Sequence, residues 1–271
     1  MLPAQRRNEI LTVLRARPAI SVKELARMLG ASEMTIRRDL KVLDADGRLE
    51  KVRGGAVPVG QALPPLDRPA DVRSTLNLEA KLAIGRAAAA MVPDGATLIL
   101  DSGTTVGMLA RALRGRVTVV VTTSLRALSE LRDQSATRIH LIGGRYRPET
   151  DSVTGPEVVT SLTEFSADLA FLGASAVRAG SFYNYYPEDA PIQRTMARLA
   201  CQAWLLVDSS KLTAVALGRV GALSDLTGVI TDQGAQPELL ERLRGWCRKL
   251  LVVPLPGSLG GQRTSPPTSA E

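Results

Sequence analysis

The chain has 271 residues, of which 45% are hydrophobic, 3% aromatic and 23% charged, a globular composition whose length suggests about two domains. The first residues contain no apolar signal-peptide core, and no stretch approaches the roughly 18 apolar residues of a membrane span, so we expect a cytoplasmic protein without a membrane partner. The net charge of +7 is concentrated in residues 1–60, which hold twelve Lys and Arg against seven Asp and Glu; this favours a polyanionic partner, although a solvated basic surface would have the same composition.

Two short helices are predicted near the N-terminus. The first spans Gln5 to Arg15, with its apolar residues on one side, and Pro18 ends it. A capping box from Ser21 to Glu24 begins the second, because the serine hydroxyl and the glutamate carboxylate can each satisfy a free backbone N–H group. Its apolar positions recur at i, i+3, i+4 and i+7, and Gly30 provides the backbone freedom for a tight turn.

A third helix is predicted after Ser32, with one apolar and one basic face. Ile36, Leu40 and Leu43 recur at i, i+4 and i+7 and should face the core. A helix fits the major groove of DNA, where Arg can bind guanine and Thr can contact a thymine methyl group or a phosphate. The DNA-binding residues predicted on or beside this helix are Ser32, Met34, Thr35, Arg37, Arg38 and Lys41. An ordinary exposed helix of a three-helix bundle is the alternative.

A β-wing is predicted directly after the third helix. Asp46 and Gly47 form a turn, residues 48–52 alternate polar and apolar side chains like a strand, and residues 53–56 turn back. Lys51 and Arg53 at its tip are predicted to contact the sugar-phosphate backbone, which positions a protein on DNA without reading its sequence.

This region resembles the N-terminal signature of the DeoR family of bacterial regulators. The resemblance rests on Ser32 to Leu40 (SEMTIRRDL), Leu43, Asp46-Gly47 and Gly54-Gly55-Ala56. It implies that residues 1–57 form a winged helix-turn-helix domain that binds a double-stranded DNA operator, with Thr35, Arg37 and Arg38 on the recognition helix. Asp39, nearer the buried side, is predicted to be an ion-pair partner instead of a base-reading residue.

Residues 58–75 are predicted to be a linker, because four prolines lie between Val57 and Ala70 with little apolar periodicity. From residue 76 to 254, helical and apolar extended segments alternate, which predicts an α/β domain with a mostly parallel sheet and helices on both faces. The predicted helices are 78–91, 106–113, 125–132 and 156–165, and the predicted strands are 97–100, 117–121, 138–142, 169–172, 204–207, 229–231 and 250–253. Residues 255–271, rich in Pro, Gly and Ser, are predicted to be a disordered tail.

Small and hydroxylated residues follow several of the predicted strands. Because ligands of parallel sheets bind beyond the carboxyl ends of the strands, backbone N–H groups and hydroxyls there can hold a phosphate or carboxylate. A DSSK motif adds Lys211 as a cation, and Asp208 as its partner or as an acceptor for a ligand hydroxyl. The predicted effector-binding residues are Asp101, Ser102, Gly103, Thr104, Thr105, Thr122, Thr123, Ser124, Gly143, Gly144, Asp208 and Lys211. Ordinary turn and cap residues, with a surface salt bridge in the DSSK motif, are the alternative.

These motifs extend the DeoR resemblance from Arg6 to about Val253, and they are similar to the phosphate-binding loops of ribose-5-phosphate isomerase and glucosamine-6-phosphate deaminase. The resemblance implies a homo-oligomeric transcription regulator, a repressor of carbohydrate metabolism genes, whose sensor domain binds a phosphorylated sugar. Two features depart from the family pattern. Thr123 stands where the family usually has Asn, and residues 181–187 (SFYNYYP) hold three of the four tyrosines. That segment could shape the specificity pocket, form an exposed loop or make an oligomer contact.

The competing hypothesis is a sugar-phosphate isomerase or deaminase with an accessory DNA-binding module. The related isomerases use an Asp-Gly-Ala-Asp type motif, whereas the comparable segment here, Ala170 to Ala174 (AFLGA), has no carboxylate. Cys201 and Cys247 lack CxxC spacing and are predicted to be buried thiols, and the one histidine, His140, lies in an apolar run. The sequence also contains no GxxxxGK[ST] or GxSxG motif. We therefore expect binding without catalysis, no metal and no cofactor.

Overall fold

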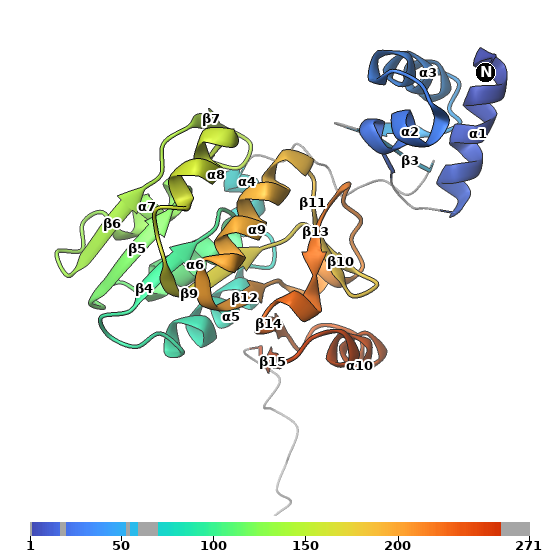
Figure 1. The fold of residues 1–271 in the computed structure, drawn as a ribbon. Coiled ribbons are helices and arrows are strands. Elements are labelled where there is room, and N and C mark those ends of the chain that lie inside the picture. The colour runs from blue at the N-terminus through green and yellow to red at the C-terminus, as the bar shows by residue number, and fades with distance from the viewer. Residues whose placement is uncertain (1, 17–19, 53–54, 59–69, 256–271) are drawn as a thin grey trace, which may run out of the picture.

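The computed structural model describes residues 2–16, 20–52, 55–58 and 70–255, which form two domains (Figure 1). The elements of the N-terminal domain are α1 (Pro3–Ala16), β1 (Ile20–Ser21), α2 (Val22–Leu29), α3 (Glu33–Ala45), β2 (Glu50–Val52) and β3 (Gly55–Val57). The three strands pair antiparallel in the order β1-β3-β2. β2 and β3 therefore form the predicted wing, and the winged helix-turn-helix prediction is confirmed.

Local sequence sets the boundaries of α2 and α3. The Ser21 hydroxyl accepts a hydrogen bond from the Glu24 N–H at 3.1 Å, and the Glu24 carboxylate accepts one from the Ser21 N–H at 3.2 Å, so the capping box is present. Gly30 ends α2 with a φ of 60°, in the left-handed region that glycine adopts without strain, and Ser32 caps α3. The apolar faces of the three helices share one core, whose fully buried members include Ile10, Leu25, Ile36, Leu40 and Leu43.

The C-terminal domain is built on a seven-stranded parallel sheet. The strands are β4 (Thr97–Leu100), β5 (Thr118–Thr122), β6 (Thr137–Leu141), β9 (Ala167–Gly173), β12 (Ala200–Leu206), β14 (Gly228–Asp232) and β15 (Leu250–Val253). Their order across the sheet is β15-β14-β12-β9-β4-β5-β6, and every neighbouring pair is parallel.

Helices cover both faces of this sheet (Figure 1). One face packs against α5 (Leu78–Ala90), α6 (Thr104–Ala112) and α7 (Leu125–Leu131), and the other against α8 (Pro156–Leu162), α9 (Ala190–Arg198) and α10 (Pro237–Trp246). Along β4, Leu98 and Leu100 point into the first core and Ile99 into the second, as strand alternation requires. The predicted α/β fold class is confirmed, and inner strands such as β4, β5 and β14 are apolar because both of their faces are buried.

Shorter elements complete the domain. These are α4 (Ala70–Thr75), the hairpin β7 (Arg145–Arg147) and β8 (Ser152–Thr154), the antiparallel sheet β10 (Ala176–Arg178), β11 (Ser181–Asn184) and β13 (Gly218–Ala222), and the 3₁₀ helices η1 (Pro187–Asp189), η2 (Ser209–Leu212) and η3 (Leu223–Asp225). These elements were not predicted, because three to six residues are too few to establish a hydrophobic period. Nor was α9, whose buried side includes the polar residues Gln193 and Thr195. None of the described helices has the length and apolar character needed to span a membrane.

The predicted burial of the two cysteines is wrong. Both thiols are free, Cys201 is exposed and Cys247 is only partly buried. Cys201 lies at the start of β12, where the first residues of the strand are accessible and only the later ones enter the core. His140 is also exposed, although its ring lies 5.3 Å from that of Phe165.

Gly85 marks a close approach between α5 and α6. A Cβ atom on Gly85 would lie 2.7 Å from the backbone nitrogen of Leu109 and 2.7 Å from the backbone carbon of Met108. Because backbone atoms cannot rotate away, Gly85→Ala should lower the free energy of unfolding by about 1 to 3 kcal/mol, measured by urea denaturation. The matched control is Gly245→Ala in α10, where no heavy atom lies within 4 Å of the Cβ position. It should be neutral or stabilising by up to about 1 kcal/mol, and equal losses in both variants would contradict the close packing.

Candidate functional site

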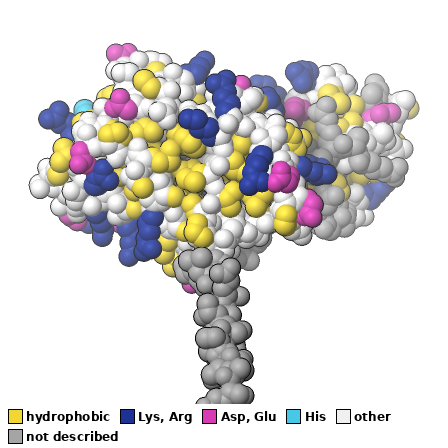
Figure 2. Space-filling model, turned by 90° about the horizontal axis from the view of Figure 1, so that it is seen from below, with side chains coloured by type: hydrophobic (Ala, Val, Ile, Leu, Met, Phe, Trp, Pro, Cys, Tyr) yellow, Lys and Arg dark blue, Asp and Glu magenta, His cyan; other side chains and the backbone are white. Residues whose placement is uncertain are grey.

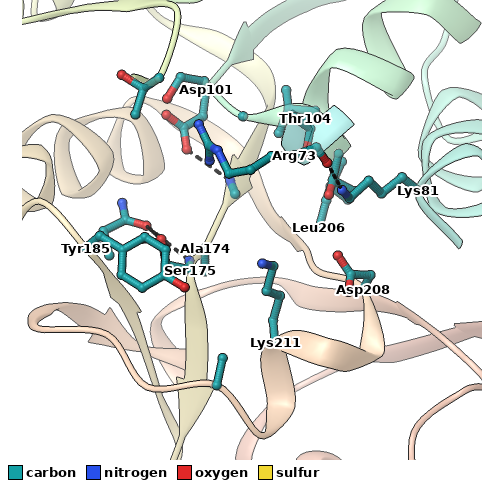
Figure 3. A pocket seen from close by; sticks show the side chains of 18 of the residues that line it. Arg73, Lys81, Asp101, Thr104, Ala174, Ser175, Tyr185, Leu206, Asp208 and Lys211 are labelled. Atoms are coloured by element: carbon teal, nitrogen blue, oxygen red, sulfur yellow. Dashed lines mark hydrogen bonds between the residues drawn. The ribbon is translucent and has the colours of Figure 1, made fainter. Parts of the chain in front are cut away.

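The strand order reverses beside β4. The chain builds from β4 through β5 to β6 on one side, then returns with β9 to pair along the other side of β4. The loops after β4 and β9 therefore lead away from each other at the carboxyl ends of the strands, an arrangement that leaves a crevice. A cavity of about 420 Å³ opens at this point, and residues after β12 and from α4 and α5 complete its walls (Figure 3).

Asp101 lies at the end of β4 and is buried beneath the cavity. Its Oδ2 accepts hydrogen bonds from the Gly173 N–H at 2.9 Å and from Gln193 Nε2 at 2.5 Å. Asn184 Nδ2 donates to Gln193 Oε1 at 2.7 Å, and Asn184 Oδ1 accepts from the Ser175 hydroxyl at 3.3 Å. Burial raises the pKa of Asp101 to about 6, although its hydrogen bonds to Gly173 and Gln193 favour the charged form. This wall presents fixed amide, hydroxyl and carboxyl groups that suit a polyhydroxylated ligand.

The N-terminus of α6 lies at the same cavity. Gly103 precedes the helix with a φ of 115° and supplies no side-chain cap, so the N–H groups of Thr104 and Thr105 have no partner within the helix. These donors and the helix dipole favour an anion. Their position three and four residues after Asp101 places an anion-binding group beside the hydroxyl-binding wall.

Lys211 and Asp208 bring opposite charges to the cavity. The Lys211 ammonium group makes no hydrogen bond or ion pair with any residue that the structure describes, and it points into the cavity (Figure 3). Burial lowers the pKa of Lys211, while the nearby Asp208 carboxylate raises it. Asp208 Oδ1 accepts a hydrogen bond from Asn77 Nδ2 at 3.0 Å, but its Oδ2 is buried without a partner among the described residues. Both groups have unused capacity to bind a ligand.

Two further cations line the cavity but already have protein partners. Lys81 Nζ donates to the backbone carbonyls of Arg73 and Leu76, each at 2.6 Å, and so fixes the corner between α4 and α5. Burial lowers the pKa of Lys81 to about 8. Arg73 Nη2 donates to the backbone carbonyl of Glu149 at 2.7 Å, and burial lowers the pKa of Arg73. Lys81 and Arg73 therefore contribute positive electrostatic potential to the cavity, but some of their N–H donors are already used by backbone carbonyls and are not available to a ligand.

The residues predicted from strand ends divide into two groups. Seven of them line the cavity: Asp101, Ser102, Gly103, Thr104, Thr105, Asp208 and Lys211. The structure does not bring Thr122, Thr123, Ser124, Gly143 or Gly144 to its walls. Thr122 Oγ1 instead donates to the Leu100 carbonyl at 2.6 Å, and the Ser124 hydroxyl caps α7. Gly144 packs under β8 and α8, where a Cβ atom would meet Val153 and Val158.

Several cavity residues were missed by the sequence analysis. Arg73, Asn77 and Lys81 precede the first strand of the sheet, so no strand-end argument could find them. Gln193 lies on α9, which was not predicted. The tyrosine-rich segment did give a signal, because Tyr185 and Tyr186 line the cavity and are buried.

The predicted DNA-binding residues lie on the exposed side of α3 and on the wing. Arg38 and Lys41 are exposed and make no hydrogen bond or ion pair with any described residue, whereas Arg37 pairs with Glu33 at 3.3 Å. Met34 is 70% exposed. The Ser32 and Thr35 hydroxyls are 2.8 Å apart at the N-terminus of the helix.

Three further residues near α3 were assigned roles from the sequence: Asp39, Lys51 and Arg53. Asp39 is buried and pairs with Arg6 at 2.5 Å and Arg7 at 3.2 Å, which confirms its predicted structural role. Lys51 has an exposed side chain, and its backbone N–H donates to Asp44. Arg53 lies outside the described residues.

Comparison with known proteins gives two family matches. Residues 6–61 match the DeoR-like helix-turn-helix domain, and residues 76–233 match the DeoR C terminal sensor domain. The chain is similar to the lactose phosphotransferase system repressor of Lactococcus lactis subsp. lactis, with 33% identity over 88% of this chain and 94% of that protein. It is 29% identical to a putative aga operon transcriptional repressor of Escherichia coli O157:H7, over 89% of this chain and 90% of that protein.

Solved structures align less closely. Ribose 5-phosphate isomerase A from Methanocaldococcus jannaschii shares 21% identity over 51% of this chain and 55% of that chain, with a TM-score of 0.38. The full-length sorbitol operon regulator of Klebsiella pneumoniae shares 15% identity over 82% of this chain and 93% of that chain, also with a TM-score of 0.38. Scores at this level carry no functional argument.

The raised pKa of Asp101 makes stability depend on pH. The folded protein holds this proton up to about pH 6, whereas the unfolded chain releases it near the ordinary aspartate pKa of 3.8. The contribution of the group to stability is therefore present in full below about pH 4 and is lost as the pH rises through about 6. Asp101→Asn keeps an oxygen for both hydrogen bonds but cannot ionise. As the pH rises from 4 to 7, the free energy of unfolding of Asp101→Asn should increase relative to that of the wild type. The difference should reach about 3 kcal/mol, because the pKa of Asp101 is raised by about two units.

Chemical denaturation at a series of pH values measures this difference. Asp133→Asn is the control, because the Asp133 side chain is 82% exposed. The control should follow the wild-type profile, and an Asp101→Asn profile parallel to both would refute the assigned burial effect.

Proposed function

The chain belongs to the DeoR family, and from this premise we propose that it is a DNA-binding transcriptional repressor of a sugar-related operon, controlled by a phosphorylated sugar bound in the cavity. Two relatives are named as repressors of the lactose phosphotransferase system and of the aga operon. Because its target would be genomic DNA, the proposal places the protein in the bacterial cytoplasm.

The observation that carries the effector proposal is the pair of unsatisfied charged groups at one end of the cavity. Among the described residues, the Lys211 ammonium group has no hydrogen-bond or ion-pair partner, and Asp208 Oδ2 is buried without a hydrogen bond. Leaving such groups unpaired is costly, and a ligand that offers an anion to one and a hydroxyl to the other removes the cost. A phosphorylated sugar has both groups.

The remaining walls support the same ligand class. The N–H groups at the start of α6 and the Lys211 ammonium provide donors for phosphate oxygens. The chain of Asp101, Gln193, Asn184 and Ser175 provides acceptors and donors for ring or chain hydroxyls. A cavity of about 420 Å³ is within the usual range for small-molecule sites.

The DNA-binding proposal rests on the exposed face of α3. Arg38 and Lys41 are held outward by buried Ile36 and Leu40 on the other side of the same helix. Because their side chains have no partner within the described part of the chain, their donors are available for base edges and phosphates. Lys51 on the wing would contact the adjacent backbone.

A homo-oligomer would place two such N-terminal domains on half-sites about 10 bp apart or at multiples of that spacing. Figure 2 shows apolar side chains gathered across the middle of one face, with Lys and Arg among and around them, and we propose this face for the interface.

The enzyme hypothesis is less favoured. Asp101 is a cavity carboxyl whose pKa of about 6 would suit proton transfer, but Gly173 and Gln193 both bind its Oδ2. The named relatives are regulators. We propose binding without turnover, and steady conversion of a phosphorylated sugar by the purified protein would support the enzyme hypothesis instead.

Arg38→Ala should weaken binding to a specific duplex, which can be obtained by selection from random DNA with the wild-type protein. If Arg38 binds guanine, the loss should be about 1 to 3 kcal/mol and sequence preference should relax at one position. Fluorescence anisotropy measures the affinity. Arg86→Ala removes an exposed arginine from α5 and should leave the affinity unchanged. Wild-type affinity in Arg38→Ala would exclude this residue from base recognition.

Lys211→Met should weaken effector binding while leaving the fold intact. A thermal-shift screen of phosphorylated sugars first identifies the wild-type ligand, and calorimetry then gives its dissociation constant. Loss of a charge-assisted hydrogen bond of about 1.5 to 3 kcal/mol should raise that constant about 10- to 100-fold. Lys249→Met, at an exposed lysine, is the control. A screen without any wild-type shift, or an unchanged affinity in Lys211→Met, would contradict the proposed site.

A further inference from the structure

The two faces of the wing strand β3 pack against different domains. Ala56 is buried in the core of the N-terminal domain. Val57, the next residue, is also fully buried, but it belongs to a hydrophobic cluster whose other buried members, Ala176, Tyr185, Tyr186 and Ala216, lie in the C-terminal domain. Because successive strand residues point to opposite sides, β3 has one side in its own domain and the other against the second domain.

Gly55 extends the same contact. A Cβ atom on Gly55 would lie 2.7 Å from Leu217 Cδ1, and Leu217 is itself buried. Gly55 and Val57 are two residues apart and therefore share a face of β3. Gly55 thus lies against the loop that leads into β13, and Val57 packs in one cluster with Ala216 of that loop and with the two tyrosines.

The two tyrosines that share this cluster with Val57 also line the cavity. We name Tyr185 and Tyr186 the tyrosine wall; they connect β11 to η1 and are 8% and 6% exposed. One layer of side chains therefore separates the cavity from the wing strand. Ala214, which also lines the cavity, packs against the same cluster.

A buried arginine fixes one end of the tyrosine wall. The Arg147 guanidinium lies 4.3 Å from the centre of the Tyr186 ring and forms an ion pair with Asp189 at 2.7 Å. It also pairs with Glu188 at 3.0 Å. Asp189 lines the cavity, so a ligand that engages Asp189 would alter the group that holds Tyr186.

We infer that the contact between Val57 and the tyrosine wall transmits the state of the cavity to the DNA-binding domain. The inference rests on the proposed function and deepens it by naming the residues through which regulation passes. A ligand that moves Tyr185 or Tyr186 changes the packing of Val57, and with it the position of the wing. Because coupling is reciprocal, DNA that changes the position of the wing must also alter the tyrosine wall.

Hydrogen exchange tests the contact without any effector. Full-length wild type, Val57→Asp and Val117→Asp are compared with and without the selected duplex, and exchange is followed over residues 181–190. Val117 is 56% exposed and far in sequence from the wing, so it controls for the substitution itself. In Val57→Asp the segment should exchange at least about twofold faster than in the other two proteins. Duplex should change its exchange in wild type and in Val117→Asp but not in Val57→Asp.

A second variant, Ala216→Asp, alters the same hydrophobic cluster from the C-terminal domain. Ala216→Asp leaves the sequence of the DNA-binding domain untouched and should reproduce the exchange behaviour of Val57→Asp. It keeps the test decisive if Val57→Asp unfolds the wing. Wild-type exchange over residues 181–190 in Ala216→Asp, or wild-type protein that binds duplex with no change in this segment, would overturn the inference.

The coupling itself is measured with the sugar phosphate that gives the largest thermal shift. A typical coupling changes the DNA affinity of wild type about 5- to 150-fold, and this factor should fall below about twofold in Ala216→Asp. An unchanged factor would overturn the inference. Failure of the proposed function has a different signature, since no duplex is then selected or no compound shifts the wild-type melting temperature.

Discussion

The direction in which the parallel sheet grows is the constraint on which the site depends. β4 is the first strand of the sheet, yet it lies near the middle, with β5 on one side and β9 on the other. Loops that follow β4, β9 and β12 therefore meet at one crevice, while the loops after β5 and β6 lie on the far side of β4 and help hold the fold instead. Similar loop sequences thus acquire different roles from their place in the strand order.

Burial of charge explains which cavity residues remain available to a ligand. Lys81 is satisfied by two carbonyls, and Arg147 by Asp189 and Glu188, so both act as parts of the framework. Lys211 and Asp208 Oδ2 face the cavity without such partners among the described residues. Because an unsatisfied buried polar group is unfavourable, these atoms are where ligand binding gains most.

In the N-terminal domain, both the helix α3 and the strand β3 have two faces with different surroundings. α3 buries Ile36 and Leu40 and leaves Arg38 and Lys41 outward, following the helical period. β3 buries Ala56 in its own domain and Val57 against the tyrosine wall, following the strand period. In the proposed regulator, the N-terminal domain therefore presents α3 to DNA and one face of β3 to the sensor domain. The β3 contact links the two domains.

The sequence by itself determined the elements with strong periodicity or specific caps. These include the capping box at Ser21, the apolar face of α3, the family signature and the apolar strands of the sheet, because each depends on residues only a few positions apart. Only the tertiary structure decided that Asp101 and Lys211 share a cavity with Gln193 and Lys81, whereas Thr123 and Gly143 stand apart from it. Strand order and the packing of α4 and α9 depend on contacts between distant segments, and the local sequence pattern does not encode which strand ends will meet.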